Sequence, residues 1–331
     1  MLGQLFYAEP VLGSAVVSVG GQTALERKGW PVKRLLLVLG CATTAYALAL
    51  LLWGDGRHVS LAVLWSATGL QAAGLCLASY LLRGLRWKLW MAHFGRTFGW
   101  PEGLRLYLAG YAFTPTPGNV GEAMRGMMLA RQPLPLLQSL AIFGAERLAD
   151  LFCFLLLCLP ALGWLMRGIS VQSLAGWQMG LGLSVLVAGF AAALVLWRIR
   201  QRLLQHFDWL QGAWACLAVR PLVWFALTLT AWAAQGLAVW LVCGALNVQI
   251  PVLTAIGFYA VAMVSGALSA LPAGLGGMEL VFAGLLVAQG ASTAQALTIT
   301  VVVRLLTLWL AVAIGVAALT YSAVVRKDIR F

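Results

Sequence analysis

Apolar runs of about 20 residues recur along this sequence, and a helix of that length crosses the ~30 Å hydrocarbon core of a bilayer. The runs do not alternate apolar and polar residues, as the strands of a membrane β-barrel do. Hydrophobic residues make up 62% of the chain and charged residues only 10%, a composition unlike that of soluble domains. The sequence therefore predicts an all-α integral membrane protein.

Six of the apolar runs are predicted to be transmembrane helices. They cover residues 35–53, 61–82, 134–159, 177–197, 221–242 and 293–320. Two further pairs of apolar segments, 103–114 with 122–131 and 252–271 with 279–290, are each interrupted by a stretch containing Pro and Gly. We expect each pair to form a re-entrant helical hairpin, because interrupted helices at membrane depth lie inside the protein or line a polar cavity. The mixed segment 198–219 is predicted to be an amphipathic helix in the interface.

The breaks in these hairpins contain residues that permit tight turns and close backbone approach. The hairpin tips contain Pro117, Gly118 and Gly121 in the first, and Pro272, Gly274, Gly276 and Gly277 in the second. Glu122 and Glu279 each begin the second piece of a hairpin, where the helix dipole favours a carboxylate. Each glutamate is therefore either a helix cap or part of a polar cavity, in which Glu122 orders Arg125 or Arg147. Free N–H groups at the same helix starts are a candidate anion site.

The two halves of the chain match at a constant spacing. Glu122 precedes Arg147 by 25 positions, Glu279 precedes Arg304 by the same 25, and the two pairs are offset by 157. Three crossings per half make the predicted repeat inverted, as in many secondary transporters with a site between their halves. The predicted divisions are a cytoplasmic lead-in (1–33), a first transmembrane repeat (34–159), an outer linker (160–176) and a second transmembrane repeat (177–331).

The net charge is +12, and the distribution of Lys and Arg residues predicts how the chain is oriented in the membrane. In a membrane protein such an excess lies mostly on cytoplasmic loops near anionic lipid, and it does not indicate nucleic-acid binding. With both hairpins re-entrant, Arg57 and Arg167 lie outside, Arg147 and Arg304 lie within the membrane, and the rest of the 22 Lys and Arg residues lie on the cytoplasmic side. Both termini are therefore predicted to be cytoplasmic.

Charged side chains occur inside two predicted spans, although each costs roughly 2.5–3.5 kcal/mol at the centre of a bilayer on insertion scales. Glu146, Arg147 and Asp150 lie in the third span, where Arg147 and Asp150 are i,i+3 neighbours that can pair. This group either neutralises itself and locks the bundle, or leaves Arg147 partly free to bind a phosphate bidentately. Arg304 has no acidic neighbour within one turn, so its partner is either Glu279 or an anionic ligand.

A basic aromatic segment follows the second predicted span. It contains Arg83, Arg86, Trp87, Lys88 and Trp90. Such segments usually anchor a protein at the membrane interface, where long basic side chains reach the headgroups. The alternative is capture of a lipid headgroup by side chains such as Arg86, because the segment lies where a lipid phosphate would enter the first hairpin.

Signatures of enzyme chemistry are missing from the sequence. It contains no Walker loop, nucleophile elbow or metal-ligand cluster, so we expect neither an enzyme nor a bound metal or cofactor. The carboxylates within the predicted membrane region leave proton coupling open.

Four motifs, taken as an ordered set, resemble those of the lysylphosphatidylglycerol synthase transmembrane-region family, which is also called flippase-like. They are Arg86-Trp87, Thr116-Pro117-Gly118-x-x-Gly121-Glu122-x-x-Arg125, Glu146-Arg147-x-x-Asp150 and Pro272-x-Gly274-x-Gly276-Gly277-x-Glu279. The resemblance covers roughly residues 35–320. It implies a domain of the bacterial cytoplasmic (inner) membrane that moves lipids with phosphate-bearing headgroups between leaflets. Because the family's aminoacyl-transfer domain is not found here, we expect a stand-alone member whose substrate is a polyprenyl-phosphate-linked sugar or a phospholipid.

We therefore expect a lipid flippase, in which Arg125, Arg147 and Arg304 compensate the lipid phosphate and the neighbouring carboxylates order them. One alternative is a membrane-embedded transferase that acts on a lipid-linked sugar, and another is a non-transporting partner of a lipid-modifying enzyme. The expected ligand is a membrane lipid with an anionic headgroup. A homo-oligomer and a complex with a lipid-modifying enzyme stay open.

Overall fold

The computed structural model of the protein describes residues 61–115, 120–131, 133–168, 207–269, 271–326 and 329. The predicted lead-in, the predicted spans 35–53 and 177–197, and the tip residues Pro117 and Gly118 lie outside the described residues. Within the described residues the elements are helical, apart from an isolated bridge between Leu129 and Ile329. The prediction of an all-α protein is confirmed.

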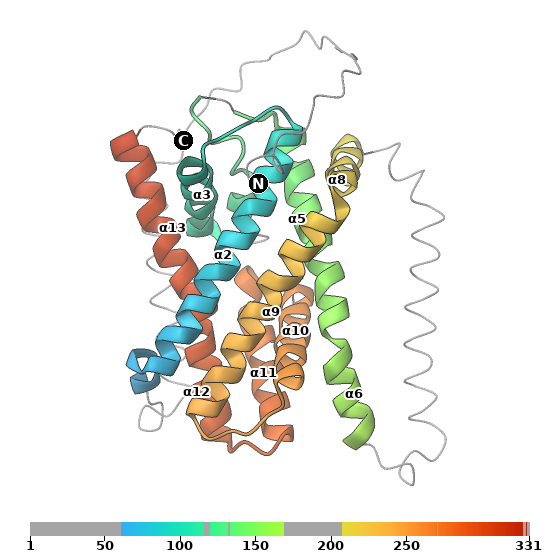
Figure 1. Cartoon of the computed structure of the whole chain (residues 1–331), viewed down its shortest axis with the longest axis vertical. Helices are drawn as coiled ribbons and strands as arrows, with labels where there is room; N and C mark the ends of the chain where they lie inside the picture. Colours follow the sequence, from blue (N-terminus) through green and yellow to red (C-terminus); the bar gives the residue numbers. More distant parts are fainter. Residues whose placement is uncertain are drawn as a thin grey trace.

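The helices form one elongated bundle (Figure 1). The α-helices are α2 (Ala67–His93), α3 (Trp100–Ala109), α4 (Val120–Ala123), α5 (Leu136–Leu157), α6 (Leu159–Gly168), α8 (Asp208–Ala218), α9 (Pro221–Ala245), α10 (Val252–Leu268), α11 (Gly277–Ala288), α12 (Thr293–Arg304) and α13 (Leu310–Thr320). The 3₁₀ segments are η2 (Leu61–Trp65), η3 (Gly110–Phe113) and η5 (Pro272–Gly274), and the π-helical segments are η6 (Leu305–Trp309) and η7 (Tyr321–Arg326).

Three helical stretches of the described chain are long and apolar enough to cross a membrane. They are Leu136–Met166, Pro221–Ala245 and Thr293–Arg326. The spans predicted at 134–159, 221–242 and 293–320 are therefore confirmed as long apolar helices, and the chain is a multi-pass membrane protein. The first stretch runs through α5 into α6, so helix continues past residue 159, where the predicted outer linker begins.

Helix α2 is longer than the second predicted span, because it continues from residue 82 to His93. It packs along α9 through the middle of the bundle (Figure 1). Most side chains from Arg83 to Met91 are buried, and both Arg86 and Trp90 are 0% exposed. The prediction that this basic aromatic segment is an interfacial anchor is therefore wrong for these residues, because partners from other helices enclose them.

The second interrupted pair, α10 and α11, is a helical hairpin whose two helices pack on each other. Gln295 at the start of α12 donates a hydrogen bond from Nε2 to the carbonyl of Leu246 at the end of α9, with a distance of 3.1 Å. The chain thus enters and leaves this hairpin at the same end of the bundle. Helix α3 of the first pair lies at the opposite end (Figure 1). This arrangement is the one expected of two re-entrant hairpins, while their depth in a membrane and the inverted symmetry stay predictions.

The first interrupted pair is shorter than predicted. Its second piece, expected over 122–131, is the single helical turn α4, and turns follow it to Arg131. In a longer helix, the backbone carbonyls of this segment would accept hydrogen bonds within the helix. Here the Ala123 carbonyl instead accepts a hydrogen bond from Ser139 Oγ, near the start of α5, at 2.6 Å. The Leu134 N–H donates to the Gly126 carbonyl at 2.9 Å. A helix of one turn has almost no dipole, so the N-terminus of α4 does not form the predicted anion site.

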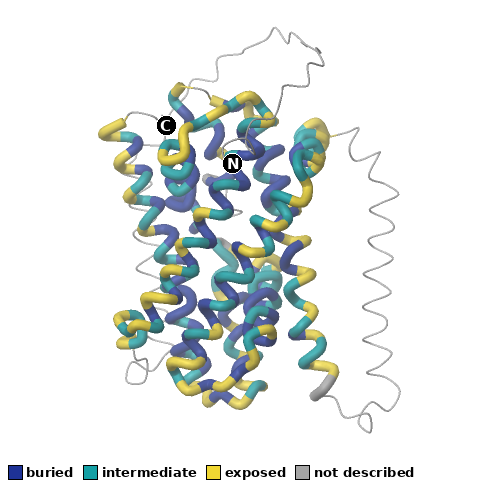
Figure 2. The backbone as a smooth tube through the Cα atoms, in the orientation of Figure 1, coloured by how far each residue is buried: buried dark blue, intermediate teal, exposed yellow. Residues whose placement is uncertain are grey.

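Burial follows the inward faces of the helices, and the outer faces of α5 and α6 are apolar and exposed (Figure 2). Phe152, Leu155 and Leu159 are each 56% exposed on this surface. Exposed apolar side chains in this number are expected where a helix faces lipid. The polar and charged side chains described below therefore lie inside an apolar shell.

Candidate functional site

Charged residues from three parts of the first half meet in the interior of the bundle. The ion-pair cluster, as we call it, consists of the four arginines Arg83, Arg86, Arg125 and Arg147 and the three carboxylates Glu122, Glu146 and Asp150. The arginines at 83 and 86 come from α2, the residues at 122 and 125 from α4 and the turn after it, and the other three from α5. Six of the seven residues were predicted site residues, and the structure brings those six together.

Arg86 and Asp150 form the tightest ion pair of the cluster. Arg86 Nη1 lies 2.6 Å from Asp150 Oδ1 and also donates to Thr228 Oγ1 at 2.9 Å. Trp232 Nε1 donates to the same Asp150 oxygen at 3.0 Å. These contacts join α2, α5 and α9 with short bonds between buried groups, so this pair holds the bundle together.

Arg147 lies at the edge of the cluster. Its Nη2 lies 3.3 Å from Asp150 Oδ2 and 3.6 Å from Glu122 Oε2, and its side chain is 41% exposed. The predicted i,i+3 pair with Asp150 is therefore present. Because part of this side chain is exposed, Arg147 can contact both the cluster and a ligand outside it.

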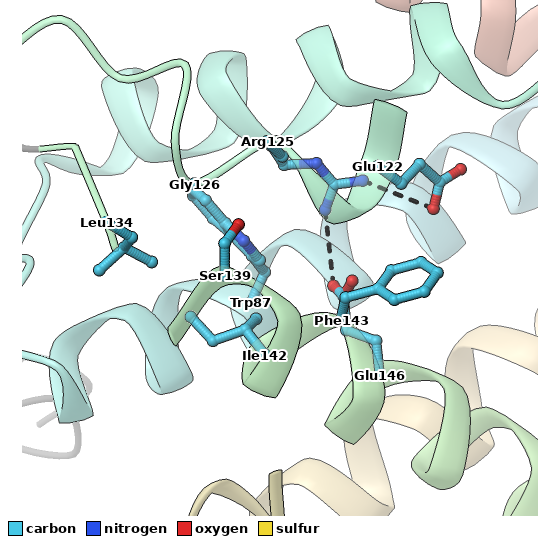
Figure 3. Close-up of a pocket in the computed structure, with 9 residues that line it drawn as sticks. All are labelled: Trp87, Glu122, Arg125, Gly126, Leu134, Ser139, Ile142, Phe143 and Glu146. Atoms are coloured by element: carbon cyan, nitrogen blue, oxygen red, sulfur yellow. Dashed lines mark ion pairs between the residues drawn. The ribbon is translucent and has the colours of Figure 1, made fainter. Parts of the chain in front are cut away.

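Arg125 is buried yet makes no hydrogen bond with the described residues. Its Nη2 lies 3.7 Å from Glu122 Oε2 and its Nη1 lies 3.5 Å from Glu146 Oε1, so both carboxylates are at ion-pair distance (Figure 3). The side chain is 4% exposed, and Nε, Nη1 and Nη2 are all unpartnered. Buried polar groups are almost always hydrogen-bonded, so a guanidinium with unused donors is arranged to receive an acceptor that is not part of the described chain.

The surroundings of Arg125 hold its guanidinium in place without using its donors. Its Cζ lies 4.4 Å from the ring centroid of Tyr107, at cation–π distance. On another side it packs against Gly110, where an added Cβ would lie 2.7 Å from the Arg125 Cζ. Gly110 thus permits a close approach that no other residue type would allow without moving the arginine.

A small pocket lies in front of this arginine (Figure 3). Its volume is about 10 Å³, which is roughly the space of one water molecule, and Arg125, Glu122, Glu146 and Trp87 are among the residues that line it. Pockets for whole drug-sized ligands are about 300–1,000 Å³. This pocket is far smaller, so a phosphate would reach Arg125 only after the side chains that line the pocket had moved apart.

Arg83 is a member of the cluster that was not predicted as a site residue. Its Cζ lies 4.4 Å from the ring centroid of Trp232, 5.4 Å from that of Tyr111 and 5.6 Å from that of Tyr80. Trp232 also donates to Asp150, so it links Arg83 to the rest of the cluster. The sequence carried a signal for this position, because residues three apart share a helix face and Arg83 precedes Arg86 by three.

The predicted site residues of the second half form a separate, closed pair. Arg304 donates from Nε to Glu279 Oε1 at 2.5 Å and from Nη2 to the Ala273 carbonyl at 3.1 Å. Glu279 Oε2 accepts a hydrogen bond from the Gly276 N–H at 2.7 Å, so this glutamate also caps α11. Both side chains are at most 4% exposed. The predicted pairing of Arg304 with Glu279 and the predicted cap are confirmed, and the alternative of an arginine left for an anion does not describe this conformation.

The tip of the second hairpin owes its shape to left-handed backbone. Ala273, Gly274 and Gly276 have φ angles of 53°, 66° and 85°. This tight turn points the Ala273 carbonyl at Arg304, which accounts for the glycines of the predicted tip. Gly277 begins α11, where an added Cβ would lie 2.8 Å from Cβ of Ser269, the residue after α10. In the first hairpin Gly121 lies within α4.

Comparison with known proteins shows the family. The sequence profile of the family described as "Lysylphosphatidylglycerol synthase TM region" matches residues 37–315. The chain belongs to this family. The match includes every residue of the ion-pair cluster and the Arg304–Glu279 pair, and it confirms the resemblance inferred from the motifs.

One curated relative of this lysylphosphatidylglycerol synthase transmembrane-region protein adds a shorter match. It is a "UPF0104 membrane protein" of Methanothermobacter thermautotrophicus, 36% identical over 91 residues. The aligned part is 28% of this chain and 27% of that protein. The chain therefore matches only about a quarter of the length of this relative.

Proposed function

We propose that this member of the lysylphosphatidylglycerol synthase transmembrane-region family is a lipid flippase, which moves a lipid with a phosphate-bearing headgroup between the leaflets of a membrane. The observation that supports this function is the buried guanidinium of Arg125, whose donors are unused by the described residues. Planar guanidinium groups bind phosphate oxygens bidentately. A polyprenyl-phosphate-linked sugar and a phospholipid both carry this group.

The position of the ion-pair cluster fits transport of a headgroup. Arg147 is partly exposed and Arg125 is buried behind it, and both lie within 4 Å of Glu122. In this proposal the side chains around Arg125 move apart and the phosphate passes from the outer arginine to the inner one. The apolar tail of such a lipid stays in the bilayer beside the exposed apolar faces of α5 and α6, so only the headgroup needs a polar path.

Arg304 has a different role in this proposal. Its hydrogen bonds hold the tip of the second hairpin, and its charge is matched by Glu279 at 2.5 Å. We assign phosphate binding to the first half of the molecule and a structural role to the closed pair of the second half. The chain is on this view a transporter rather than an enzyme, because binding and release of the headgroup need no covalent step.

The proposal is tested by reconstituting the full chain in phosphatidylcholine vesicles with phosphatidylglycerol that carries a fluorophore on one acyl chain. Reduction of the outer-leaflet fluorophore with dithionite reports transbilayer movement. We expect rapid movement with the native chain and a loss of at least about tenfold in the Arg125→Gln/Arg147→Gln variant, since each lost bidentate contact is worth roughly 1.5–3 kcal/mol. Arg326→Ala, at an exposed position of η7, is the control. Equal rates in the double variant and the native chain would exclude this site.

The transferase alternative is tested on the same vesicles. A new lipid species, seen by mass spectrometry after incubation with a lipid-linked sugar, would favour an enzyme. Movement of the labelled lipid without any new species would favour the flippase. A chain that does neither, but copurifies with a lipid-modifying enzyme, would favour the non-transporting partner.

A further inference from the structure

Two kinds of wall enclose the small pocket in front of Arg125 (Figure 3). Trp87 belongs to α2, and Ile142 and Glu146 belong to α5; both helices are long and pack on α9. Another wall belongs to residues 120–131, which we call the Arg125 segment and which consist of the single turn α4 and the turns after it. The pocket has the space of about one water molecule, so one of these walls must move before a phosphate reaches the arginine.

The Arg125 segment is the wall with the less regular backbone. The Arg125 N–H donates to the Glu122 carbonyl at 3.2 Å, and this bond closes a turn that does not continue as a helix. In α2 and α5 the backbone hydrogen bonds continue through the length of each helix. Segments with few such bonds open at a lower free energy than long packed helices. The wall that we expect to move is therefore the Arg125 segment.

Ile329, which follows α13 and η7, contacts this segment. It pairs with Leu129 in an isolated antiparallel bridge, and the two residues are 8% and 4% exposed. Both line a second cavity of about 10 Å³, together with Arg125 and with Leu319 of α13. Arg125 thus lines both cavities, and a movement that separates Leu129 from Ile329 would release the backbone that carries the arginine.

The chain before Ile329 is held on α3. Arg105 Nη1 donates to Ser322 Oγ of η7 at 2.9 Å, and Arg105 Cζ lies 5.6 Å from the ring centroid of Tyr321, at cation–π distance. Ser322 is 0% exposed. The bridge beyond η7 is isolated, and a short strand pairing by itself is only marginally stable. It can therefore break and re-form while η7 keeps its place.

We infer that Ile329 is a latch on the Arg125 segment, and that its release from Leu129 is the step that lets a headgroup phosphate reach Arg125. The inference rests on the proposed function and adds the part of the molecule that moves. Closed, the latch keeps the guanidinium behind a pocket with the space of about one water. Open, it allows the Arg125 segment to move away from α5.

The first experiment measures opening without transport. Ile142→Cys places a thiol on α5 at a pocket position that is 3% exposed, and a water-soluble methanethiosulfonate reagent labels it only when the pocket opens. Mass spectrometry of peptides reports each thiol separately. Adding Ile329→Ala should speed this labelling at least about tenfold, because truncating a buried isoleucine weakens the closed state. Val325→Ala, at a position 62% exposed, is the control that should change nothing. Cys153 and Cys216, both 0% exposed, should stay slow in every variant.

The second experiment locks the latch. Residues paired across an antiparallel bridge have Cα atoms about 4.5–5.5 Å apart, within the range of a disulfide, so Leu129→Cys combined with Ile329→Cys allows a cross-link. In vesicles the oxidised chain is expected to lose transport of labelled phosphatidylglycerol and to regain it with dithiothreitol. Each single variant should not respond to the reductant. Movement is measured by extracting outer-leaflet label with albumin, because dithionite would reduce the disulfide.

The outcomes separate the latch from the proposed function. Equal labelling of the Ile142→Cys thiol with and without Ile329→Ala would overturn the latch. Faster labelling of Cys153 and Cys216 as well would also overturn it, since the whole bundle would then have loosened. Equal transport by the oxidised and reduced cross-linked chain would show that release of the latch is not needed. If the native chain moves no lipid, the flippase fails, and the labelling experiment alone decides the latch.

Discussion

Two glutamate–arginine pairs stand at the same spacing in this chain, Glu122–Arg147 and Glu279–Arg304, and the structure treats them differently. In the second half the ions lie 2.5 Å apart, and both side chains are at most 4% exposed. In the first half the ions lie 3.6 Å apart, and the arginine side chain is 41% exposed. The same sequence relation thus produces a closed structural pair in one half and an open pair in the other.

The neighbours of the two pairs explain the difference. Adding 157 to the positions of Arg125 and Glu146 leads to Phe282 and Val303, and adding it to Arg86 leads to Cys243. At these three positions the second half has apolar residues where the first half has charges, and Asp150 corresponds to the uncharged Thr307. With apolar residues at these three positions, Glu279 and Arg304 bind each other directly. In the first half, the additional charged residues share their ion pairs among several partners, and the hydrogen-bond donors of Arg125 are left unused.

Removal of Arg304 is expected to have the largest effect on stability. Arg304→Ala leaves Glu279 buried without its 2.5 Å partner, and breaking a buried ion pair from one side costs about 3–5 kcal/mol. The free energy of unfolding can be measured by titration with sodium dodecyl sulfate in mixed micelles. Arg304→Met combined with Glu279→Gln keeps an acceptor for the Gly276 N–H and should recover most of the loss. If Arg304→Ala instead leaves stability unchanged and stops transport, the second pair is not structural and the contrast drawn here is wrong.

Arg125→Lys is expected to have the next largest effect, on transport. Lysine keeps the positive charge beside Glu122 and Glu146 but lacks the planar fork that binds phosphate bidentately. We expect transport of labelled phosphatidylglycerol to fall about tenfold, which is about 1.4 kcal/mol, with stability changed by less than about 1 kcal/mol. Rates equal to those of the native chain would show that charge alone is needed at this position.

Gly110→Ala is expected to displace Arg125 without changing the arginine itself. The new methyl group would lie 2.7 Å from Arg125 Cζ, so the flexible guanidinium must shift while the backbone stays. A displacement near 1 Å from productive geometry lowers activity, by up to about 100-fold in enzymes, and we expect a fall of about three- to tenfold here. Gly74→Ala on α2, where an added Cβ meets nothing within 4 Å, is the matched control. Equal rates in both variants would mean that the position of Arg125 is not critical.

Arg147→Gln is expected to have the smallest effect on stability. Its ion pairs are 3.3 and 3.6 Å long and its side chain is 41% exposed; exposed pairs contribute about 0–1 kcal/mol. We expect a change in unfolding free energy below about 1 kcal/mol in mixed micelles, against several for Arg304→Ala. A loss as large as that of Arg304→Ala would show that the two pairs are alike after all.

Much of the fold followed from local sequence. Long apolar runs predicted helices over 134–159, 221–242 and 293–320, since only hydrophobic length is needed for that inference. The structure has them over Leu136–Met166, Pro221–Ala245 and Thr293–Arg326. The i,i+3 spacing predicted the contact of Arg147 with Asp150, and the common spacing of the halves indicated Glu279 as the partner of Arg304. The length of α2 was underestimated, because a charged residue in a sequence does not show whether another helix supplies its partner.

The sequence alone was thus sufficient for the class of protein and its family, and it indicated six of the seven members of the ion-pair cluster as candidate site residues, because these inferences depend on residue type and local spacing. The tertiary structure decided which arginine keeps unused hydrogen-bond donors. Arg304 donates to Glu279 and Ala273, whereas Arg125 lies near two carboxylates without a hydrogen bond to either. Whether a buried charge has a partner of opposite charge depends on residues far away in the chain, and the spacing of nearby residues does not predict which of those distant residues lie beside it.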